Sequence, residues 1–310
     1  MNRCLCCQKR VDADARHHAK CLKDLFGKAR VPDITFSKAD IQARASGIGG
    51  RMSATGAQMK VSVRLDAKEW ALEVAGAEGT HVLKPEPDGF PGLPGNENLC
   101  MNIAAGLGMS VPPHGLFPMA DGRLCYVVKR FDRLDDGTKL RGETMYRILG
   151  SEDEYKGSLE RVGRAIRGRA ANAGLDCVDF FERVLLCHLI GAGDMHLKKW
   201  ALLRDEDDEW SLAPCYDLVS CAHYAPQEES ALAVRGRKQG LTRSDFNALA
   251  EDLRIDPKAA ENSFAKLRGA QDGIVELVRE SEMSPERRKN MEEIILSRYN
   301  RLFGFRLAVL

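Results

Sequence analysis

The stretch that decides the fold is GAGDMHLKKWALLRDEDDEWSLAPCYDLVS, residues 191–220. It reads as the end of an apolar helix, a polar loop, a short strand, an acidic turn, a second strand and a second loop. Asp194 lies in the first loop and Asp217 in the second. In phosphoryl transfer, one such carboxylate accepts a proton from the attacking hydroxyl and the other holds Mg²⁺. On spacing alone, the alternative of two ordinary cap or turn residues is favoured.

Strand-like runs dominate the N-terminal half of the chain and helical patterns dominate the C-terminal half. Alternating apolar residues between turn residues predict strands at 61–65, 70–74, 80–84, 111–118 and 124–131. Helical spacing predicts helices at 97–107, 158–172, 178–190 and through most of 244–304. This order predicts an α+β protein with two lobes and a cleft between them. We expect an N-terminal module at 1–27, a β-rich lobe at 28–142 and a helical lobe at 143–310.

The composition is that of an ordinary globular protein and excludes several classes. The 310 residues carry 46 Lys and Arg against 45 Asp and Glu, so the formal net charge of +1 gives no argument for nucleic-acid binding. No apolar run approaches the roughly 18 residues that a membrane span needs. The first ten residues, MNRCLCCQKR, lack the apolar core of a signal peptide. We therefore expect a cytoplasmic protein with no membrane partner.

The N-terminal module carries a candidate zinc site. Cys4 and Cys7 form one closely spaced pair, and His18 and Cys21 form a second pair ten residues later. Thiolates and a neutral imidazole at such spacing suit tetrahedral Zn²⁺, and a metal explains how so short a segment folds. Cys6 and His17 are spare donors, which leaves the ligand set open. The alternative is a cysteine-bearing tail that is disordered or packed on a helix.

Two further segments have the residue types of a phosphate site. The loop SATGAQMKVSV, residues 53–63, combines small residues and Gly56 with Lys60 at the start of a strand. Backbone N–H groups and an ammonium there suit phosphate, although the loop is not a P-loop because GK[ST] is missing. Lys84 ends the apolar run HVLKP at 81–85. Alone, each segment is equally well explained as a hairpin loop or an exposed strand end.

Taken together and in order, these motifs resemble a known family. They are SxxGxQxK at 53–60, VLKP at 82–85, PGLPGNE at 91–97, VVKRFDR at 127–133, GAGDMHLKKW at 191–200 and LAPCYDLVS at 212–220. The set resembles the HipA-type serine/threonine kinases of bacterial toxin–antitoxin systems over residues 50–300. The resemblance implies a bilobal protein-kinase-like fold, use of ATP and Mg²⁺, and a protein substrate such as an aminoacyl-tRNA synthetase or another translation protein.

The resemblance also implies roles for single residues. Asp194 would be the catalytic base, Asp217 would coordinate Mg²⁺, and Lys84 would contact the phosphates of ATP. The backbones of Lys129 and Phe131 would meet the adenine.

Asp132 would lie near the ribose. The segment 53–60, including Gly56 and Lys60, would be the phosphate-side loop, which carries the autophosphorylation site of the family. Ser53 is the first candidate for that modification and Thr55 the second, since their S-x-T spacing is similar to the paired hydroxyls of the short-form toxins called HipT. A phosphate there would place about −1.5 to −2 charge where the ATP phosphates must lie.

One position departs from the family pattern. The pattern D-x-H-x-K-N-F has an Asn as a second Mg²⁺ ligand, and Lys199 occupies that position here. A protonated ammonium has no lone pair for a metal, so Lys199 either replaces part of the metal's charge, or marks a slow kinase, or marks a protein that only binds nucleotide. We expect His196 to be a structural residue that orients the catalytic loop.

Three functions follow in order of preference. The first is a HipT-like toxin kinase with a HipS-like partner and a HipB-like partner, the latter giving an indirect link to DNA. The second is an impaired, nucleotide-binding pseudokinase that acts as a regulatory or binding module, for which Lys199 is the only support. The third is a nucleic-acid regulator led by the cysteine module, which the balanced charge disfavours.

Glu97 has two interpretations. It follows the loop before the predicted helix at 97–107, with Asn96 as a possible cap. An acid at a helix N-terminus is favoured by the helix dipole, and we expect this simpler role. The alternative is an ion pair with Lys84, as a kinase lysine pairs with a helix glutamate.

Overall fold

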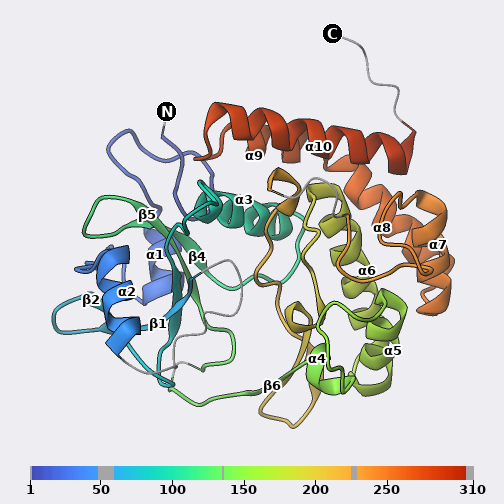
Figure 1. Cartoon of the computed structure of the whole chain (residues 1–310), viewed down its shortest axis with the longest axis horizontal. Coiled ribbons are helices and arrows are strands. Elements are labelled where there is room, and N and C mark those ends of the chain that lie inside the picture. The colour runs from blue at the N-terminus through green and yellow to red at the C-terminus, as the bar shows by residue number, and fades with distance from the viewer. Residues whose placement is uncertain (1, 48–58, 135, 225–228, 305–310) are drawn as a thin grey trace. The chain divides into compact units, whose positions relative to one another are not determined.

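The computed structural model describes residues 2–47, 59–134, 136–224 and 229–304 (Figure 1). The chain divides into two compact units. The sheet unit comprises Met1–Asn102, Pro112–Thr138 and Glu280–Met283, and the helical unit comprises Ile103–Val111, Lys139–Arg279 and Ser284–Leu310. Each unit is described by itself below.

The sheet unit is built on five antiparallel strands in the order β2-β1-β3-β5-β4. Their bounds are Val61–Asp66 (β1), Ala71–Val74 (β2), His81–Lys84 (β3), His114–Pro118 (β4) and Leu124–Lys129 (β5). Alternate residues of β1 are buried, as the period of two demands for a sheet with one covered face. The five predicted strands are therefore confirmed, with ends shifted by a few residues.

The N-terminal segment packs on this sheet and shares its core. It contains the helices α1 (Ala19–Phe26) and α2 (Lys38–Gly47), and the sequence pattern predicted neither one separately. α1 buries Leu22, Leu25 and Phe26, which join the strand residues Val63 and Val127 in one apolar cluster. The N-terminal residues therefore share the core of the sheet unit.

α3 spans Leu93–Gly106 and begins earlier than the sequence predicted. The expected cap, Asn96, lies inside the first turn and is fully buried. The helix gives way at Gly108, whose φ of +74° is a conformation that glycine adopts without a Cβ penalty. The shift of its start places Glu97 one turn into the helix instead of at its end.

The helical unit contains a bundle and a small sheet. Its helices are α4 (Met145–Ile148), α5 (Leu159–Arg169), α6 (Ala173–Ile190), α7 (Arg243–Asp252), α8 (Pro257–Gly269), α9 (Gln271–Arg279) and α10 (Pro285–Phe303). α6 is the central helix of the bundle, because it is apolar on most sides and almost every residue of its second half is buried. The sequence predicted these helices except the short α4.

A three-stranded antiparallel sheet supports the two polar loops of this unit. It consists of β6 (Arg141–Thr144), β7 (Ala201–Arg204) and β8 (Trp210–Leu212), in that order. The hairpin of β7 and β8 closes through an acidic turn in which Asp205 accepts backbone N–H bonds. The predicted hairpin bracketed by Asp194 and Asp217 is therefore confirmed.

No helix in the part of the chain that the structure describes is both long enough and apolar enough to cross a membrane.

Candidate active site

The first polar loop of the helical unit starts where α6 ends. Gly191 caps the helix with a φ of +74°. A Cβ there would lie 2.9 Å from the Cβ of Ala222, so only glycine fits both the conformation and the space. The loop then runs through Asp194 into a short 3₁₀ turn, Leu197–Lys199, and so into β7. The rigid helix and strand on either side hold the loop in place.

Asp194 is held by two neighbours. Its Oδ1 accepts a hydrogen bond of 2.9 Å from the Tyr155 hydroxyl, and its Oδ2 accepts one of 2.9 Å from Nζ of Lys199. The Asp194 side chain keeps 33% of its surface exposed, whereas that of Lys199 keeps 12%. The carboxylate is therefore oriented from two sides and still open to a ligand.

Lys199 links the two predicted aspartates. Burial by itself lowers the pKa of this ammonium, but the negative charges of Asp217 and Asp194 outweigh burial and raise the pKa above its usual value. Lys199 is therefore a fixed positive charge at neutral pH, and it lies within the electrostatic reach of both carboxylates. Asp194 and Asp217 therefore both act on the charge of one lysine, although their spacing alone favours two ordinary cap or turn residues.

Asp217 has an unusual backbone. Its φ is +58°, in the left-handed region that few residues other than glycine occupy, although Asp and Asn are enriched there. Such a conformation in a loop persists only where the surroundings hold it, and it is common at functional sites. The neighbouring Tyr216 helps to fix the backbone of this loop, since its hydroxyl donates a 2.9 Å hydrogen bond to the carbonyl of Lys198.

His196 is built into the loop as a support. It is buried, and its Nδ1 accepts a 3.3 Å hydrogen bond from the Lys198 backbone. Burial lowers its pKa, which favours the neutral ring. Its Nε2 lies 3.7 Å from Glu154, which also forms an ion pair with the Lys198 ammonium. These contacts agree with the expected structural role, in which His196 orients the loop.

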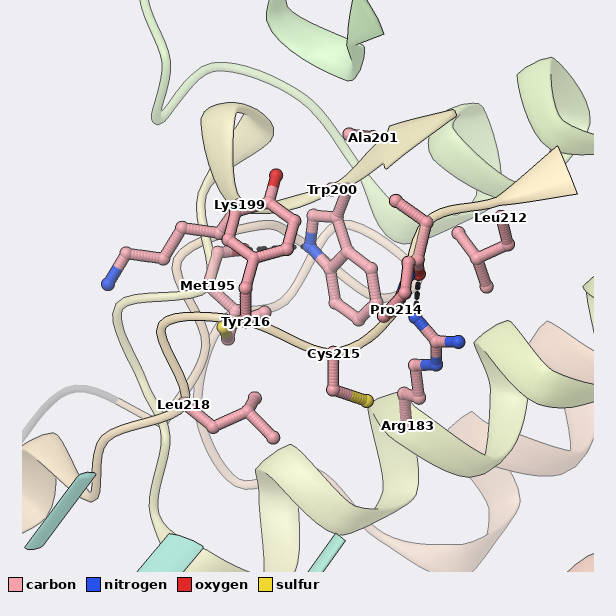
Figure 2. Close-up of a pocket in the computed structure, with 11 residues that line it drawn as sticks. Arg183, Met195, Lys199, Trp200, Ala201, Leu212, Pro214, Cys215, Tyr216 and Leu218 are labelled. Carbon is pink, nitrogen blue, oxygen red and sulfur yellow. Dashed lines mark hydrogen bonds between the residues drawn. The ribbon is translucent and has the colours of Figure 1, made fainter. Parts of the chain in front are cut away.

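A small cavity lies under the second loop (Figure 2). Apolar side chains such as Trp200 and Leu218 line it, and the Lys199 side chain extends away from its centre. Arg183 of α6 donates a hydrogen bond to the carbonyl of Ala213 at the start of this loop, and its other nitrogens pair with Asp179. We interpret the cavity as packing that positions the loop, since its lining is mainly apolar and the ammonium of Lys199 is directed away from it.

In the sheet unit, Lys84 is paired with Glu97. Nζ of Lys84 lies 2.5 Å from Oε1 of Glu97, and the two side chains are 5% and 1% exposed. Our expectation that Glu97 is only an N-terminal acid is therefore wrong. The start of α3 at Leu93 moves Glu97 away from the helix end, and the alternative ion pair is what forms.

The residues predicted to meet the nucleoside lie around the end of β5. The N–H of Lys129 donates 2.9 Å to the carbonyl of Pro113, so this amide is already used within the chain. Phe131 follows two residues later. Asp132 is held by Arg130 at 2.9 and 2.7 Å and by Arg133 at 2.7 Å. Burial raises the pKa of Asp132, but the bonds and charges of these two arginines lower it overall.

The predicted phosphate-side loop lies mostly outside the described residues. Ser53, Thr55 and Gly56 all fall in the segment that the structure does not describe. Lys60 is described, is exposed and directly precedes β1.

The four predicted zinc ligands come together. One thiolate or ring nitrogen from each of Cys4, Cys7, His18 and Cys21 lies within 4.8 Å of the others. In a zinc tetrahedron with bonds near 2.3 Å, the ligand atoms lie roughly 3.8 Å apart, so the cluster needs little movement to close on a metal. Nε2 of His18 is 2.9 Å from the carbonyl of Arg10, an arrangement that leaves Nδ1 for a metal.

Of the two spare donors, His17 points elsewhere, whereas Cys6 stays beside the cluster with its thiol in contact with Cys4 and is not one of the four grouped residues. The His17 ring stacks on Phe117 at 4.8 Å, and its Nε2 lies 3.0 Å from the carbonyl of Leu116. Cys6 is buried against β4, where a Cβ on Gly115 would come within 2.5 Å of the sulfur. The structure therefore narrows the ligand set to Cys4, Cys7, His18 and Cys21.

Sequence reasoning missed Tyr155 and Glu154, which contact the first polar loop, and Arg183, which bonds the second. Tyr155 and Glu154 lie in the irregular segment SEDEYKGS, residues 151–158, and Arg183 lies on α6. An irregular polar segment has no period that predicts its contacts. Arg183 had one signal, because a lone arginine in an apolar helix needs a buried partner.

Comparison with known proteins agrees with this geometry. The model of the HipA-like C-terminal domain matches residues 52–274, more than half of the chain. A Haemophilus influenzae protein called "Putative kinase" is 28% identical over 67% of this chain and 65% of its own length. Sinorhizobium fredii "Putative kinase Y4dM" is 31% identical over 71% of this chain and 58% of its own length. The chain thus spans less than two thirds of the length of these curated relatives.

Solved structures confirm the predicted fold. HipA of Shewanella oneidensis, solved with HipB and operator DNA, covers 88% of this chain and 72% of its own chain, with a TM-score of 0.71 at 19% identity. The Helicobacter pylori proinflammatory kinase CtkA covers 75% of this chain and 91% of its own, with a TM-score of 0.51 at 13% identity. The fold is thus that of HipA and related kinases, and the chain belongs to the HipA-like C-terminal domain family.

Proposed function

We propose that this protein is a HipA-type kinase that transfers the γ-phosphoryl group of Mg·ATP to a serine or threonine hydroxyl of a protein. The single observation that carries the proposal is the 2.9 Å ion pair of Lys199 with Asp194, on which the negative charge of Asp217 also acts. We propose that the two carboxylates, which phosphoryl transfer requires, form one centre.

Asp194 is the proposed base. Its two oxygens each accept one bond, from Tyr155 and from Lys199, and each retains a lone pair for a substrate hydroxyl. The two bonds orient the carboxylate. Asp194 thereby accepts the proton of the attacking hydroxyl, while Lys199 stabilises negative charge that develops on the transferred group.

The donor set fits one Mg²⁺ better than two. Asp217 offers a carboxylate, which suits Mg²⁺, and the metal would neutralise phosphate charge when bound. At the position of the second family ligand stands Lys199, whose ammonium cannot ligate a metal. We propose that its charge replaces the second metal, so that a single Mg²⁺ on Asp217 serves the reaction.

The sheet unit supplies the proposed nucleotide contacts. Lys84, oriented by Glu97, is proposed for the ATP phosphates, and the loop with Gly56 and Lys60 is proposed to cover them. For the adenine, the hydrogen-bonded N–H of Lys129 leaves its carbonyl and the backbone of Phe131 as candidates. Asp132 is proposed to lie near the ribose.

The biological role follows from the family. HipA of Shewanella oneidensis was solved with HipB and operator DNA. We propose that this chain is likewise the toxin of a toxin–antitoxin system, with HipB-like and HipS-like partners and only an indirect link to DNA. An aminoacyl-tRNA synthetase or another translation protein is the proposed substrate.

Autophosphorylation tests the proposal directly. The purified protein is incubated with Mg·ATP, and its mass and phosphopeptides are measured. We expect phosphate on Ser53 or Thr55, and we expect Asp194→Asn to lower its rate by roughly 10²–10⁴-fold, the range for loss of a general base.

Asp208→Asn is the matched control. It makes the same chemical change in the same hairpin, in a turn where Asp208 pairs with Arg204. It should leave the rate unchanged. Transfer that persists in Asp194→Asn at the wild-type rate would refute the assignment of the base.

A second candidate function is a nucleotide-binding pseudokinase, and the Lys199–Asp194 pair favours it. In that pair, Lys199 occupies one lone pair of the Asp194 carboxylate, which the family's Asn would leave to the metal site. Lys199→Asn restores the family pattern and separates the two functions. A large gain in phosphorylation indicates an impaired kinase, whereas a loss indicates that the lysine takes part.

For the Cys/His cluster we propose a structural Zn²⁺. Three thiols and one imidazole are the ligands that zinc prefers, and four protein ligands leave no open position for chemistry. Hydrogen bonds from the Cys21, Cys6 and Cys7 thiols already lower the pKa of Cys4 despite its burial, which favours the thiolate. Metal analysis should find one zinc per chain, which Cys21→Ala removes.

A further inference from the structure

The loop between the first two zinc ligands is bonded to the helix that carries Glu97. Leu5 and Cys6 lie between Cys4 and Cys7 in the sequence. The carbonyl of Leu5 accepts 3.2 Å from Nδ2 of Asn98, and the carbonyl of Cys6 accepts 2.6 Å from Nδ2 of Asn102. Both asparagines belong to α3, which Figure 1 shows next to the N-terminal segment.

These bonds are buried and specific. Asn98 is fully buried and Asn102 is 7% exposed. Asn102 spans one turn of α3, since its Nδ2 also donates 2.8 Å to the carbonyl of Asn98. The carbonyl of Leu5 accepts a second bond of 3.0 Å, from the N–H of Leu116 in β4. The loop therefore ties α3 to the sheet through the backbone carbonyls of Leu5 and Cys6.

α3 is also the helix that orients Lys84. Glu97 is adjacent to Asn98, and its carboxylate lies 2.5 Å from Nζ of Lys84 in β3. The loop thus holds one side of α3 and the Lys84 pair forms on another. A change in the position of α3 alters the direction of the lysine that the proposed function assigns to the ATP phosphates.

Zinc would add a further restraint on the loop. Without zinc, Cys4, Cys7 and Cys21 are unlinked thiols, and the loop is held by the burial of Cys4 and Cys6 in the core of the sheet unit and by its backbone bonds. With zinc, Cys4 and Cys7 are fixed at both ends of Leu5–Cys6, and the two carbonyls are presented to α3.

We propose that Asn98 and Asn102 are positioning residues through which zinc binding sets the affinity of the protein for Mg·ATP. The expected effect on ATP affinity rests on the proposed function. The expected effect of zinc on the position of α3 does not. Loss of zinc by chelation releases the loop, frees α3 and misdirects Lys84.

The test compares zinc-loaded and zinc-free full-length protein. Zinc is removed with a zinc-selective chelator, Mg²⁺ is restored, and the affinity for Mg·ATP is measured by calorimetry. We expect affinity to fall about tenfold, which corresponds to about 1.4 kcal/mol, and to return on addition of zinc chloride. Amide hydrogen exchange of residues 93–106 should increase in the zinc-free form.

Asn102→Leu keeps all four zinc ligands and removes the shorter of the two links, while the Asn98 bond to Leu5 remains. We expect it to hold one zinc per chain, to bind Mg·ATP about five- to tenfold more weakly, and to lose most of the dependence on zinc. Cys125→Ala is the control, because Cys125 is a buried thiol of the same unit that is no ligand. It should retain the full dependence.

Three outcomes distinguish a failure of this inference from a failure of the proposed function. Zinc-free wild type with unchanged ATP affinity, or Asn102→Leu with undiminished zinc dependence, overturns the inference. Zinc-loaded wild type that binds no Mg·ATP overturns the proposed function instead. In that case the amide hydrogen exchange of residues 93–106 still tests whether zinc restrains α3. Equal exchange with and without zinc contradicts that part of the inference.

Discussion

Two lysine–carboxylate pairs, one in each unit, differ in what surrounds them. In the sheet unit, Lys84 and Glu97 are 5% and 1% exposed. In the helical unit, Lys199 and Asp194 are 12% and 33% exposed, and the attraction of Asp217 also acts on Lys199. The first pair is sealed inside the protein, and the second presents one carboxylate to the solvent.

This difference in burial gives the two ion pairs different roles. A sealed pair is costly to break because the remaining charge has no water to solvate it, so it fixes structure. An open pair exchanges partners at low cost, since water and ligands compete for each charge. The sheet unit thus holds its lysine in place, while the helical unit keeps its carboxylate available to a substrate.

The largest expected effect breaks the sealed pair. Lys84→Met leaves the Glu97 carboxylate buried without its cation, and we expect the free energy of unfolding to fall by about 3–5 kcal/mol. Urea denaturation measures the change. Lys20→Met is the control, since its pair with Asp24 is exposed and should contribute less than about 1 kcal/mol. Equal losses in both variants would contradict the sealed pair.

Replacement of the lysine of the open pair by methionine should affect the transfer rate more than the stability. Lys199→Met is expected to change the free energy of unfolding by less than about 1 kcal/mol. It should slow phosphoryl transfer about 100-fold, because a cation aimed at the developing charge is lost. Urea denaturation and single-turnover transfer measure the two effects. A large loss of stability with an unchanged rate would reverse the comparison.

The pH dependence of the free energy of unfolding tests the burial of a histidine in the sheet unit. Burial of His114 lowers its pKa from 6.5 to about 4. The neutral ring is favoured in the folded state, so its contribution is complete above pH 6.5 and is lost as the pH falls toward 4. We expect the free energy of unfolding to fall by about 1.4 kcal/mol per pH unit in this window, and by at most about 3 kcal/mol in total.

His114→Gln should remove that part of the pH dependence. Both proteins are unfolded in urea at several pH values between 4 and 7, and their difference isolates the contribution of His114. Parallel curves for the two proteins would show that the ring is not buried in a neutral form.

The smallest effect concerns the orientation of the open carboxylate. Tyr155→Phe removes one of the two bonds to Asp194 and should lower the transfer rate by about three- to tenfold, the equivalent of one hydrogen bond. Tyr146→Phe is the control in the same unit, because its hydroxyl bonds the carbonyl of Glu152 and does not bond Asp194. Similar rates in the two variants would remove Tyr155 from the site.

Much of the fold was predictable because strand and helix periods are local. The hairpin at β7 and β8 and the helix α6 followed from apolar spacing alone. The start of α3 did not, because Pro94 and Gly95 suggested a loop where the chain is already helical. That error also hid the Lys84–Glu97 pair.

The site was predictable in part for a similar reason. Asp194, Lys199 and Asp217 lie within one short stretch, so motif order brought them together. Tyr155 lies 39 residues before Asp194, and only packing brings its hydroxyl to the carboxylate. The zinc ligand set was left open by the sequence, and it was narrowed by the gathering of Cys4, Cys7, His18 and Cys21 and by the stacking of His17 on Phe117.

The most direct test of the central claim is the affinity for Mg·ATP of wild type against Asp217→Asn. Asn tolerates the left-handed conformation at this position, so the variant removes the charge without backbone strain. If Asp217 and Asp194 share one phosphoryl-transfer centre, calorimetry should show binding by wild type and a loss of at least about tenfold, about 1.4 kcal/mol, in the variant. Equal affinity in the two proteins, or no binding by either, would contradict the account.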